Sequence, residues 1–353
     1  MTFLAREEKN PIIVSGQIRP SSEDFEVIGV FNPGVTTFRG KTLLLMRVAE
    51  RPKCRDERYL YVPYFNEATS SIDIKCFDRQ DTSIDFSDCR VVVDGEGNRY
   101  LTSFSSLLLA TSENGVDFEI DPTFRMAPSN KYEAYGIEDA RIVRFGDTYF
   151  ISYTAASQYG ICTAAVTTED FVTFSPPVNI MCPDNKDISL FPEKIGGKYY
   201  AIHRPSCSEF AKPNMWLAQS ENLAFWGDHK LLMSVREGMW DSARIGASSV
   251  PIRTDRGWLV IYHGADESCA YRLGAALFDG DAPEKLIARS REPFLVPDTP
   301  YERNGFVKNV VFACGSVVEE GTIRLYYGAA DKYICLARIG LDGLIDSLEE
   351  VHS

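Results

Sequence analysis

The chain has 353 residues and a formal net charge of −13, with 44% apolar and 12% aromatic residues. This composition is typical of a globular core, and the acidic balance argues against nucleic acid and anionic membranes as partners. Length alone would allow two or three domains, but no Ser/Gly tract, Pro-rich run or block of like charge marks a linker. We therefore expect a single domain over residues 1–353.

Nine cysteines are scattered along the chain without CxxC pairs. Residues 1–9 contain no apolar signal-peptide stretch, and no apolar run approaches the length of a membrane span. In a chain this long we expect reduced thiols, which favours the cytoplasm. The four histidines lack ligand spacing, and no Gly-rich nucleotide loop or Gly-x-Ser-x-Gly elbow occurs. We therefore expect neither a metal nor an organic cofactor.

A short pattern recurs five times: a glycine turn is followed by a strand that carries polar residues at its far end. Each copy is followed by a second half, in which an alternating apolar strand leads into a small polar turn. A unit of this length repeated in an all-β chain is typical of a propeller blade, so the pattern predicts an all-β fold, a five-bladed β-propeller. The first halves lie at 40–47, 146–153, 197–204, 257–263 and 321–327, and the second halves at 107–118, 162–171, 215–223, 271–279 and 334–342.

The first unit is interrupted between its halves. About fifty residues, from roughly Glu50 to Asn98, intervene there and include strand-like runs at 59–64 and 71–77. We predict a long insertion of extra strands and a loop within blade one, placed to overhang the pocket and select substrates. The one convincing helical pattern covers 341–351, which predicts a short C-terminal helix.

Two neighbouring carboxylates lie in the run Gly136-Ile-Glu138-Asp139-Ala-Arg141, at the predicted inner strand of the second unit. A propeller gathers such strand ends around one axis, so polar residues from distant segments are expected in one pocket. Neighbouring strand residues point to opposite faces, so one carboxylate can reach the pocket while the other pairs elsewhere. Two interpretations stay open: an ion pair of Glu138 or Asp139 with Arg141, or an acid in a sugar pocket whose pKa is raised by burial.

Four basic residues gather on the third and fourth units of this acidic chain. Burying several cations together is costly unless an anion joins them, and the arginine fork suits phosphate or carboxylate. The alternative is a set of ion pairs with Asp187, Glu193 and Asp241. The four residues are Lys186, Arg204, Arg244 and His263.

With these motifs in place, the chain resembles glycoside hydrolase family 130, the β-mannoside phosphorylases and related mannosidases built on a five-bladed β-propeller. The resemblance extends from about Phe25 to Leu348. Each motif alone is weak, whereas their order along the repeats is specific. The motifs are Gly136–Ile142, Leu190–Lys194, His203–Pro205, Gly257–Gly264, Asn309–Gly315 and Tyr326–Asp331.

The resemblance also implies roles for individual residues. Asp139 matches the family's catalytic acid, which is thought to protonate the leaving oxygen through the 3-hydroxyl of the bound mannose. Lys186 stands where other members carry arginine, which keeps the charge but loses the fork. By position, Asn32, Arg47 and Asp331 match residues that hold the mannosyl unit, and Lys186, Arg204, Arg244 and His263 match the phosphate-binding set.

The basic set decides between two reactions. An inverting glycosidase needs a carboxylate base to activate water, whereas phosphate is already anionic and needs cations to hold it. We therefore predict inverting phosphorolysis of β-1,2-mannobiose or β-1,2-oligomannan, with inorganic phosphate as co-substrate and α-mannose 1-phosphate as product. The alternatives are a β-1,2-mannosidase, a phosphorylase of β-1,4-mannosyl-glucose or mannosyl-N-acetylglucosamine, and a non-catalytic propeller that binds sugars. The sequence leaves the oligomeric state open, a homo-oligomer included.

Overall fold

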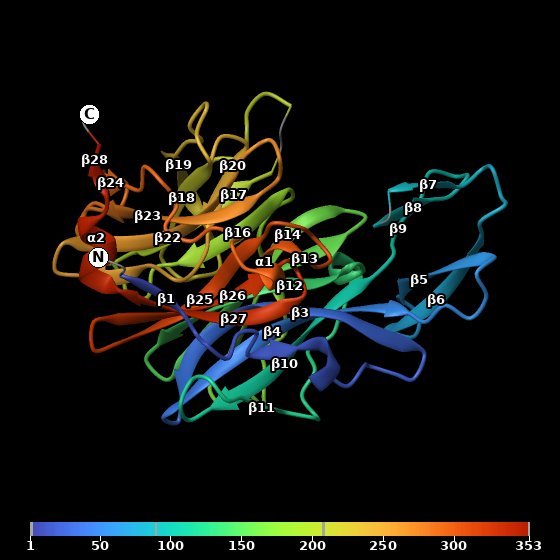
Figure 1. Ribbon diagram of the computed structural model, residues 1–353. Helices are drawn as coiled ribbons and strands as arrows, with labels where there is room; N and C mark the ends of the chain where they lie inside the picture. The colour runs from blue at the N-terminus through green and yellow to red at the C-terminus, as the bar shows by residue number, and fades with distance from the viewer. Residues whose placement is uncertain (1–2, 89, 207–208, 352–353) are drawn as a thin grey trace.

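The computed structural model describes residues 3–88, 90–206 and 209–351, and its regular structure is almost entirely β (Figure 1). The described residues form five antiparallel sheets of four or more strands and two smaller sheets. The first sheet contains β3 (Phe25–Phe38), β4 (Lys41–Pro52), β10 (Phe104–Ser112) and β11 (Glu119–Ile120). The second contains β12 (Gly136–Phe145), β13 (Thr148–Ser157), β14 (Gly160–Thr168) and β15 (Val178–Met181).

The other three large sheets follow in chain order. The third contains β16 (Asn185–Leu190), β17 (Tyr199–Pro205), β18 (Met215–Ser220) and β19 (Gly227–Met233). The fourth contains β20 (Arg244–Ala247), β21 (Ile252–Thr254), β22 (Gly257–Ala265), β23 (Tyr271–Phe278), β24 (Leu286–Arg289) and β28 (Glu349–Glu350). The fifth contains β25 (Val311–Glu319), β26 (Thr322–Ala329) and β27 (Tyr333–Gly340), together with β1 (Leu4–Arg6) and β2 (Ile13–Val14).

Each predicted repeat is confirmed as a pair of adjacent strands in one sheet. The first halves form β4, β13, β17, β22 and β26, and the second halves form β10, β14, β18, β23 and β27. These strands are apolar on both faces because each sheet is covered on both sides. On β4, for example, Leu43 and Leu45 pack in a cluster with Ile151 of the second sheet. The alternate residues Leu44 and Met46 pack in another cluster with residues of the fifth sheet.

The first strands of neighbouring sheets lie side by side. Strand β3 contacts β12 and β25, and β16 contacts β12 and β20. In β3, β12 and β16 the ladder is interrupted by a bulge that contains Asn32, Asp139 and Asp187, respectively. All three residues have positive φ angles, of 46°, 54° and 55°. Bulges redirect side chains and are common beside active sites, so three irregular positions come together at one place in the fold.

The insertion after β4 forms the two small sheets and projects to one side of the main body (Figure 1). The strands predicted at 59–64 and 71–77 are confirmed and pair with each other. A small apolar cluster of Val62, Phe77 and Val92 holds the insertion together. Its strands are β5 (Tyr59–Asn66), β6 (Ser71–Asp78), β7 (Asp85–Asp88), β8 (Val91–Val93) and β9 (Arg99–Leu101).

The chain ends differ from the sequence-based prediction. Helix α2 (Leu341–Asp346) stops well before residue 351, because the tail continues into β28, which pairs with β24. The N-terminal β1 was not predicted, and it adds an outer strand to the fifth sheet by pairing with β27. Three short helical segments were also not predicted: α1 (Pro300–Arg303) and the 3-10 turns Ser15–Gln17 and Lys131–Glu133.

The described part of the chain contains seven cysteines, and all seven are free thiols. Cys89 and Cys207 lie outside the described residues. No helix in these ranges is both long and apolar enough to cross a bilayer.

Candidate active site

The site is centred on Asp139, whose carboxylate is almost fully buried in the bulge of β12. Asn32 of β3 donates from Nδ2 to Asp139 Oδ1 at 2.9 Å, and Arg47 of β4 donates from Nη1 to the same oxygen at 3.1 Å. The other terminal nitrogen of Arg47 donates to Glu138 Oε1 at 2.8 Å, and its Nε donates to Ser105 at 3.0 Å. Arg47 therefore fixes both neighbouring carboxylates from the adjacent sheet.

The predicted ion pair of Glu138 or Asp139 with Arg141 is wrong, because Arg47 is the arginine that both carboxylates contact. Neither carboxylate forms an ion pair with Arg141. Burial alone would raise the pKa of Glu138, but Arg47 and the Lys186 ammonium, 3.5 Å from Glu138 Oε2, lower it below its usual value. Glu138 is therefore held as a carboxylate between two cations.

Asp331 lies in the turn between β26 and β27 with a positive φ of 51°. Burial raises its pKa to about 6; Asp139 and Glu138 add to this effect, and Arg47 opposes it. Three carboxyl groups therefore share the field of Arg47, and Asp331 retains a proton more readily than Glu138.

Asp187 of β16 is the centre of a second group, which is buried deeper. Its Oδ2 lies 3.1 Å from Nε of Arg204 on β17 and 3.2 Å from Nε2 of His263 on β22. Its Oδ1 lies 3.5 Å from Nη2 of Arg141 on β12. Burial opposes ionisation of Asp187, but Arg204 and His263 more than offset it, so the pKa of Asp187 falls below its ordinary value. Burial lowers the pKa of His263, although Asp187 opposes that shift.

Arg141 connects the two groups. It donates to the backbone carbonyl of Asp139 at 3.1 Å and to the carbonyls of Ala247 and Ser248 at 2.6 and 2.8 Å. Together with the contact to Asp187, these bonds join the bulge of the second sheet to the third and fourth sheets.

The four basic residues lie around these groups. Lys186 and Arg204 are opposite each other on β16 and β17. Arg244 of β20 donates from Nη1 to the Tyr271 hydroxyl at 3.2 Å, and the Tyr271 ring lies 5.9 Å from the His263 ring between centroids. In the described part of the chain, three buried nitrogen atoms of this set have no hydrogen-bond partner. They are Nε of Arg204, Nε of Arg244 and Nε2 of His263.

The alternative of ordinary ion pairs holds only in part. Asp187 does contact Arg204 and His263, as that alternative required. Glu193 and Asp241 do not pair with the basic set: Glu193 lies 3.9 Å from Arg253, and Asp241 binds Arg236 and Arg289. Two carboxylates therefore contact the basic set: Asp187 faces Arg204 and His263, and Glu138 faces Lys186.

Sequence reasoning missed two features of the site: Glu138 as a bridge between Arg47 and Lys186, and Tyr271 as the partner of Arg244. It named Asp187 as one of three possible ion-pair partners of the basic set, but not as the centre of the second group. The sequence did hold a signal for Asp187. This aspartate directly follows a charged residue, Lys186, on β16, just as Asp139 directly follows Glu138 on β12. The partner of Glu138 lies 91 residues away, which no local pattern reveals.

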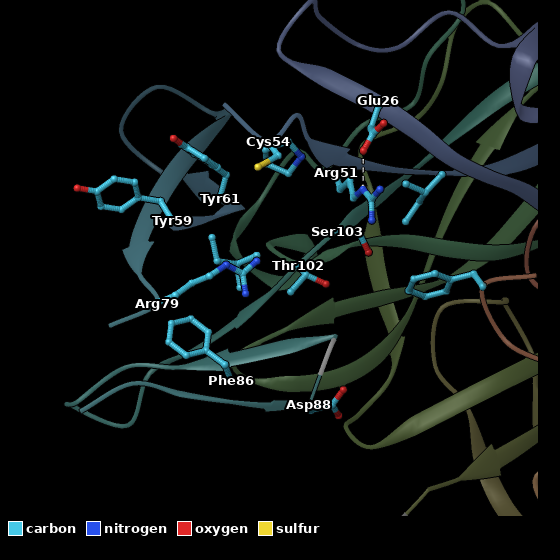
Figure 2. Close-up of a pocket in the computed structure, with 14 residues that line it drawn as sticks. Glu26, Arg51, Cys54, Tyr59, Tyr61, Arg79, Phe86, Asp88, Thr102 and Ser103 are labelled. Carbon is cyan, nitrogen blue, oxygen red and sulfur yellow. Dashed lines mark hydrogen bonds and ion pairs between the residues drawn. The ribbon is translucent and has the colours of Figure 1, made fainter. Parts of the chain in front are cut away.

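A cavity of about 470 Å³ lies beside the site, between the insertion and the first sheet. Figure 2 shows Arg79 and Phe86 of the insertion on one side, with Arg51 and Ser103 on the other. None of the eight predicted site residues lines this cavity. The two are connected through the chain, because Ile28 and Arg51 of the cavity lie on the same strands as Asn32 and Arg47, four residues away.

Within the described ranges, no group of three His, Cys, Asp or Glu side chains is arranged to hold a metal ion. The site therefore consists of a buried carboxylate cluster around Arg47, next to a buried group of cations around Asp187. In class, this is an all-β protein with an acidic group and a cationic group at the meeting point of its sheets.

Comparisons with known proteins identify the family. Residues 90–350 match the glycoside hydrolase family 130 profile, described as β-1,4-mannooligosaccharide phosphorylase, and the chain belongs to this family. A β-1,2-mannobiose phosphorylase of Listeria innocua is 42% identical over 98% of both chains. A 1,2-β-oligomannan phosphorylase of a Thermoanaerobacter species is 39% identical over 69% of this chain and 81% of the relative. A solved structure of the Listeria innocua enzyme with β-1,2-mannobiose superposes with a TM-score of 0.93 at 41% identity, covering 98% of this chain and 99% of the other.

Proposed function

We propose that this protein is an inverting phosphorylase that cleaves β-1,2-mannobiose or short β-1,2-mannan with inorganic phosphate. The observation that carries the proposal is the gathering of four basic residues, Lys186, Arg204, Arg244 and His263, from the third and fourth sheets around the buried Asp187 carboxylate, with buried nitrogen atoms of three of them outside hydrogen-bonding geometry. Asp187 offsets only part of the positive charge of this set, and burying the remainder is costly. An anion with several oxygens, such as phosphate, would compensate it and accept from the terminal nitrogens of the arginines.

The proposed chemistry assigns the two groups to the two reactants. Arg204, Arg244, His263 and Lys186 hold phosphate, and one phosphate oxygen attacks the anomeric carbon while the bond to the leaving oxygen breaks. Asp139 supplies the proton through the 3-hydroxyl of the mannosyl unit. The bonds from Asn32 and Arg47 both fall on Asp139 Oδ1, which leaves Oδ2 for this proton. Asn32, Arg47 and Asp331 hold the mannosyl unit, and the product is α-mannose 1-phosphate.

The linkage is proposed from the relatives. The Listeria innocua β-1,2-mannobiose phosphorylase is 42% identical over 98% of the chain. A β-1,4-mannooligosaccharide phosphorylase of Ruminococcus albus is 35% identical over 67% of the chain, and a 4-O-β-D-mannosyl-D-glucose phosphorylase of Bacteroides fragilis is 26% identical over 69%. The relative named for a β-1,2 linkage is therefore more similar in sequence to this chain than the two named for 1,4 linkages.

We also propose that the five large sheets are the blades of a single five-bladed propeller over residues 1–353. Each sheet consists of sequential antiparallel strands. The first strands of neighbouring sheets contact each other from the fifth sheet through the first to the fourth, and β23 of the fourth sheet contacts β25 of the fifth. The pairing of β1 with β27 then places the first strand of the chain in the last of the five sheets, as expected for a closed ring. The free thiols of the described cysteines support a reducing compartment, for which we propose the cytoplasm.

The insertion is proposed to form the wall that contacts the acceptor sugar. Its cavity is lined by aromatic side chains, including Tyr61 and Phe86, together with charged groups such as Arg51 and Arg79. Apolar surface with a few polar groups is usual in small-molecule sites.

The test is a phosphate-dependence assay on three disaccharides: β-1,2-mannobiose, β-1,4-mannosyl-glucose and β-1,4-mannosyl-N-acetylglucosamine. We expect the first to be consumed fastest, and only when phosphate is present. Equal consumption of mannobiose with and without phosphate would show hydrolysis. Binding of the sugars without consumption in either condition would show a non-catalytic protein.

A further inference from the structure

We propose that Asp187 is a positioning residue that holds Arg204 and His263 in the orientation needed to bind phosphate. The inference rests on the proposed phosphorolysis and deepens it, because it assigns the phosphate pocket a carboxylate that does not itself touch the substrate.

Asp187 meets side chains from three different sheets. Its carboxylate is 3% exposed and lies 3.1 Å from Arg204 Nε and 3.2 Å from His263 Nε2, with Arg141 Nη2 at 3.5 Å. None of the other carboxylates predicted as partners contacts this set. A single anion thus fixes the relative position of two phosphate-binding groups that come from β17 and β22.

The backbone is shaped to bring this carboxylate to its place. Asp187 lies in the bulge of β16 with a φ of 55°, a conformation that aspartate tolerates better than most residues. Gly246 of β20 leaves the space open: a Cβ there would lie 2.5 Å from Asp187 Oδ2 and 2.7 Å from His263 Nε2. The pocket therefore requires a bulge on one strand and a glycine on another.

The contact also determines which atoms of Arg204 are available. Asp187 faces the Nε edge of the guanidinium, so the terminal nitrogens remain for a bidentate contact with phosphate. Asp187 Oδ2, Arg204 Nε and His263 Nε2 are close but lie outside hydrogen-bonding geometry. The contacts are therefore electrostatic, and they hold the Nε edge of Arg204 and the His263 ring toward Asp187.

Arg141 extends the same arrangement to the catalytic acid. It contacts Asp187 and donates to the backbone carbonyl of Asp139. The carboxylate that orients the phosphate donors is therefore connected, through one side chain, to the bulge that carries the acid.

The Asp187→Asn variant should change KM for phosphate in opposite directions, depending on whether Asp187 acts by orienting other side chains or only through its charge. The neutral amide makes the pocket more positive, and charge alone would then strengthen phosphate binding. If Asp187 instead acts by orienting Arg204 and His263, its loss weakens phosphate binding despite the extra positive charge, since misplaced donors lose much of their effect. The sign of the change in KM for phosphate separates the two.

The experiment measures KM for phosphate and for β-1,2-mannobiose in wild type and D187N. We expect KM for phosphate to rise about tenfold or more while KM for the sugar changes less than about twofold. The matched control is D241N, which neutralises another fully buried aspartate. Its arginine partners, Arg236 and Arg289, do not belong to the phosphate-binding set. D241N should lower the melting temperature without changing the ratio of the two KM values.

A second variant keeps the proposal testable if D187N does not fold. Gly246→Ala retains every charge but forces the Asp187 carboxylate or the His263 ring to move, so it should raise KM for phosphate in the same direction. An unchanged or lower KM for phosphate in the folded variants would overturn the positioning role. Wild type that consumes mannobiose without phosphate would instead refute the phosphorylase proposal itself.

Discussion

Asn32, Asp139 and Asp187 share a left-handed backbone conformation on three neighbouring strands. Asn and Asp adopt it at lower cost than most residues because their short polar side chains bond locally. Each of the three interrupts a ladder where the side chain is needed at the site. The residue types at these positions are therefore constrained by backbone shape as well as by chemistry.

Asp139→Asn tests the acid directly. The amide retains an oxygen for the bonds from Asn32 and Arg47, so the fold should survive, but no acidic proton remains. We expect kcat for phosphorolysis to fall by about 10²- to 10⁴-fold. Steady-state kinetics with circular dichroism as the folding control checks this, and activity near that of wild type would remove Asp139 from the mechanism.

Asp331 predicts a pH dependence of stability. Its pKa is about 6 in the folded protein, against about 4 in an unfolded chain. Between these values the folded protein holds a proton that the unfolded chain has released, so raising the pH lowers the free energy of unfolding. The contribution is fully present below about pH 4 and is lost above about pH 6.

Denaturant unfolding of wild type and Asp331→Asn at pH values from about 4 to about 7 measures this effect. The stability of wild type relative to the variant should fall as the pH rises through this window and level off above it. A difference that stays constant with pH would show that the Asp331 pKa is not raised.

At the scale of elements, the insertion is the segment that forms a cavity with the first sheet. Strands β5 to β9 form their own small sheets and enclose a cavity against β3 and β4. In the proposed function, the acceptor lies next to the insertion and the phosphate lies next to the third and fourth sheets.

Tyr61→Ala tests that separation. Tyr61 lines the cavity, whereas Tyr64 on the same strand does not and serves as the matched control. Loss of one aromatic contact, worth about 0.5–1.5 kcal/mol, should raise KM for mannobiose about twofold to tenfold and leave KM for phosphate unchanged. Equal effects of Tyr61→Ala and Tyr64→Ala would mean that the cavity does not contact the acceptor.

The strands were predictable from sequence where the chain repeats its own pattern. The glycine turns and alternating apolar residues locate β4 and β13, because both signals lie within about ten residues. The two strand-like runs of the insertion were found in the same way. Strand β28 was not, because Glu349–Glu350 is polar and becomes a strand only by pairing with β24, about sixty residues earlier.

The site was predictable as a list of residues but not as a set of contacts. The motifs indicated Asp139 and the four basic residues, and the structure brings them into two adjoining groups. The bond from Arg47 to Glu138 and the contacts of Asp187 depend on the relative placement of different sheets. Such placement follows from packing across the whole chain and has no local signature.

At the scale of the whole molecule, the N-terminus secures the last sheet. Arg6 of β1 binds Glu302 with two nitrogens, at 2.8 and 3.1 Å, and Glu302 is fully buried. Glu302 also accepts from the Tyr327 hydroxyl at 2.7 Å. The first residues of the chain are therefore joined to the fifth sheet by both strand pairing and an ion pair.

Arg6→Ala should destabilise the protein by about 2 kcal/mol, because it leaves a buried carboxylate with fewer partners. The matched control is Lys9→Ala, which removes an exposed ion pair with Asp117 and should cost less than about 1 kcal/mol. Denaturant unfolding of both variants measures the difference. Equal, small effects would mean that this end of the chain does not hold the sheet.

The most direct test of the central claim follows phosphorus-31 NMR and sugar analysis in one reaction with β-1,2-mannobiose and phosphate. Binding of phosphate by the cationic group beside Asp139 predicts one α-mannose 1-phosphate and one mannose for each disaccharide consumed. Two molecules of mannose for each disaccharide, with the phosphate signal unchanged, would contradict it.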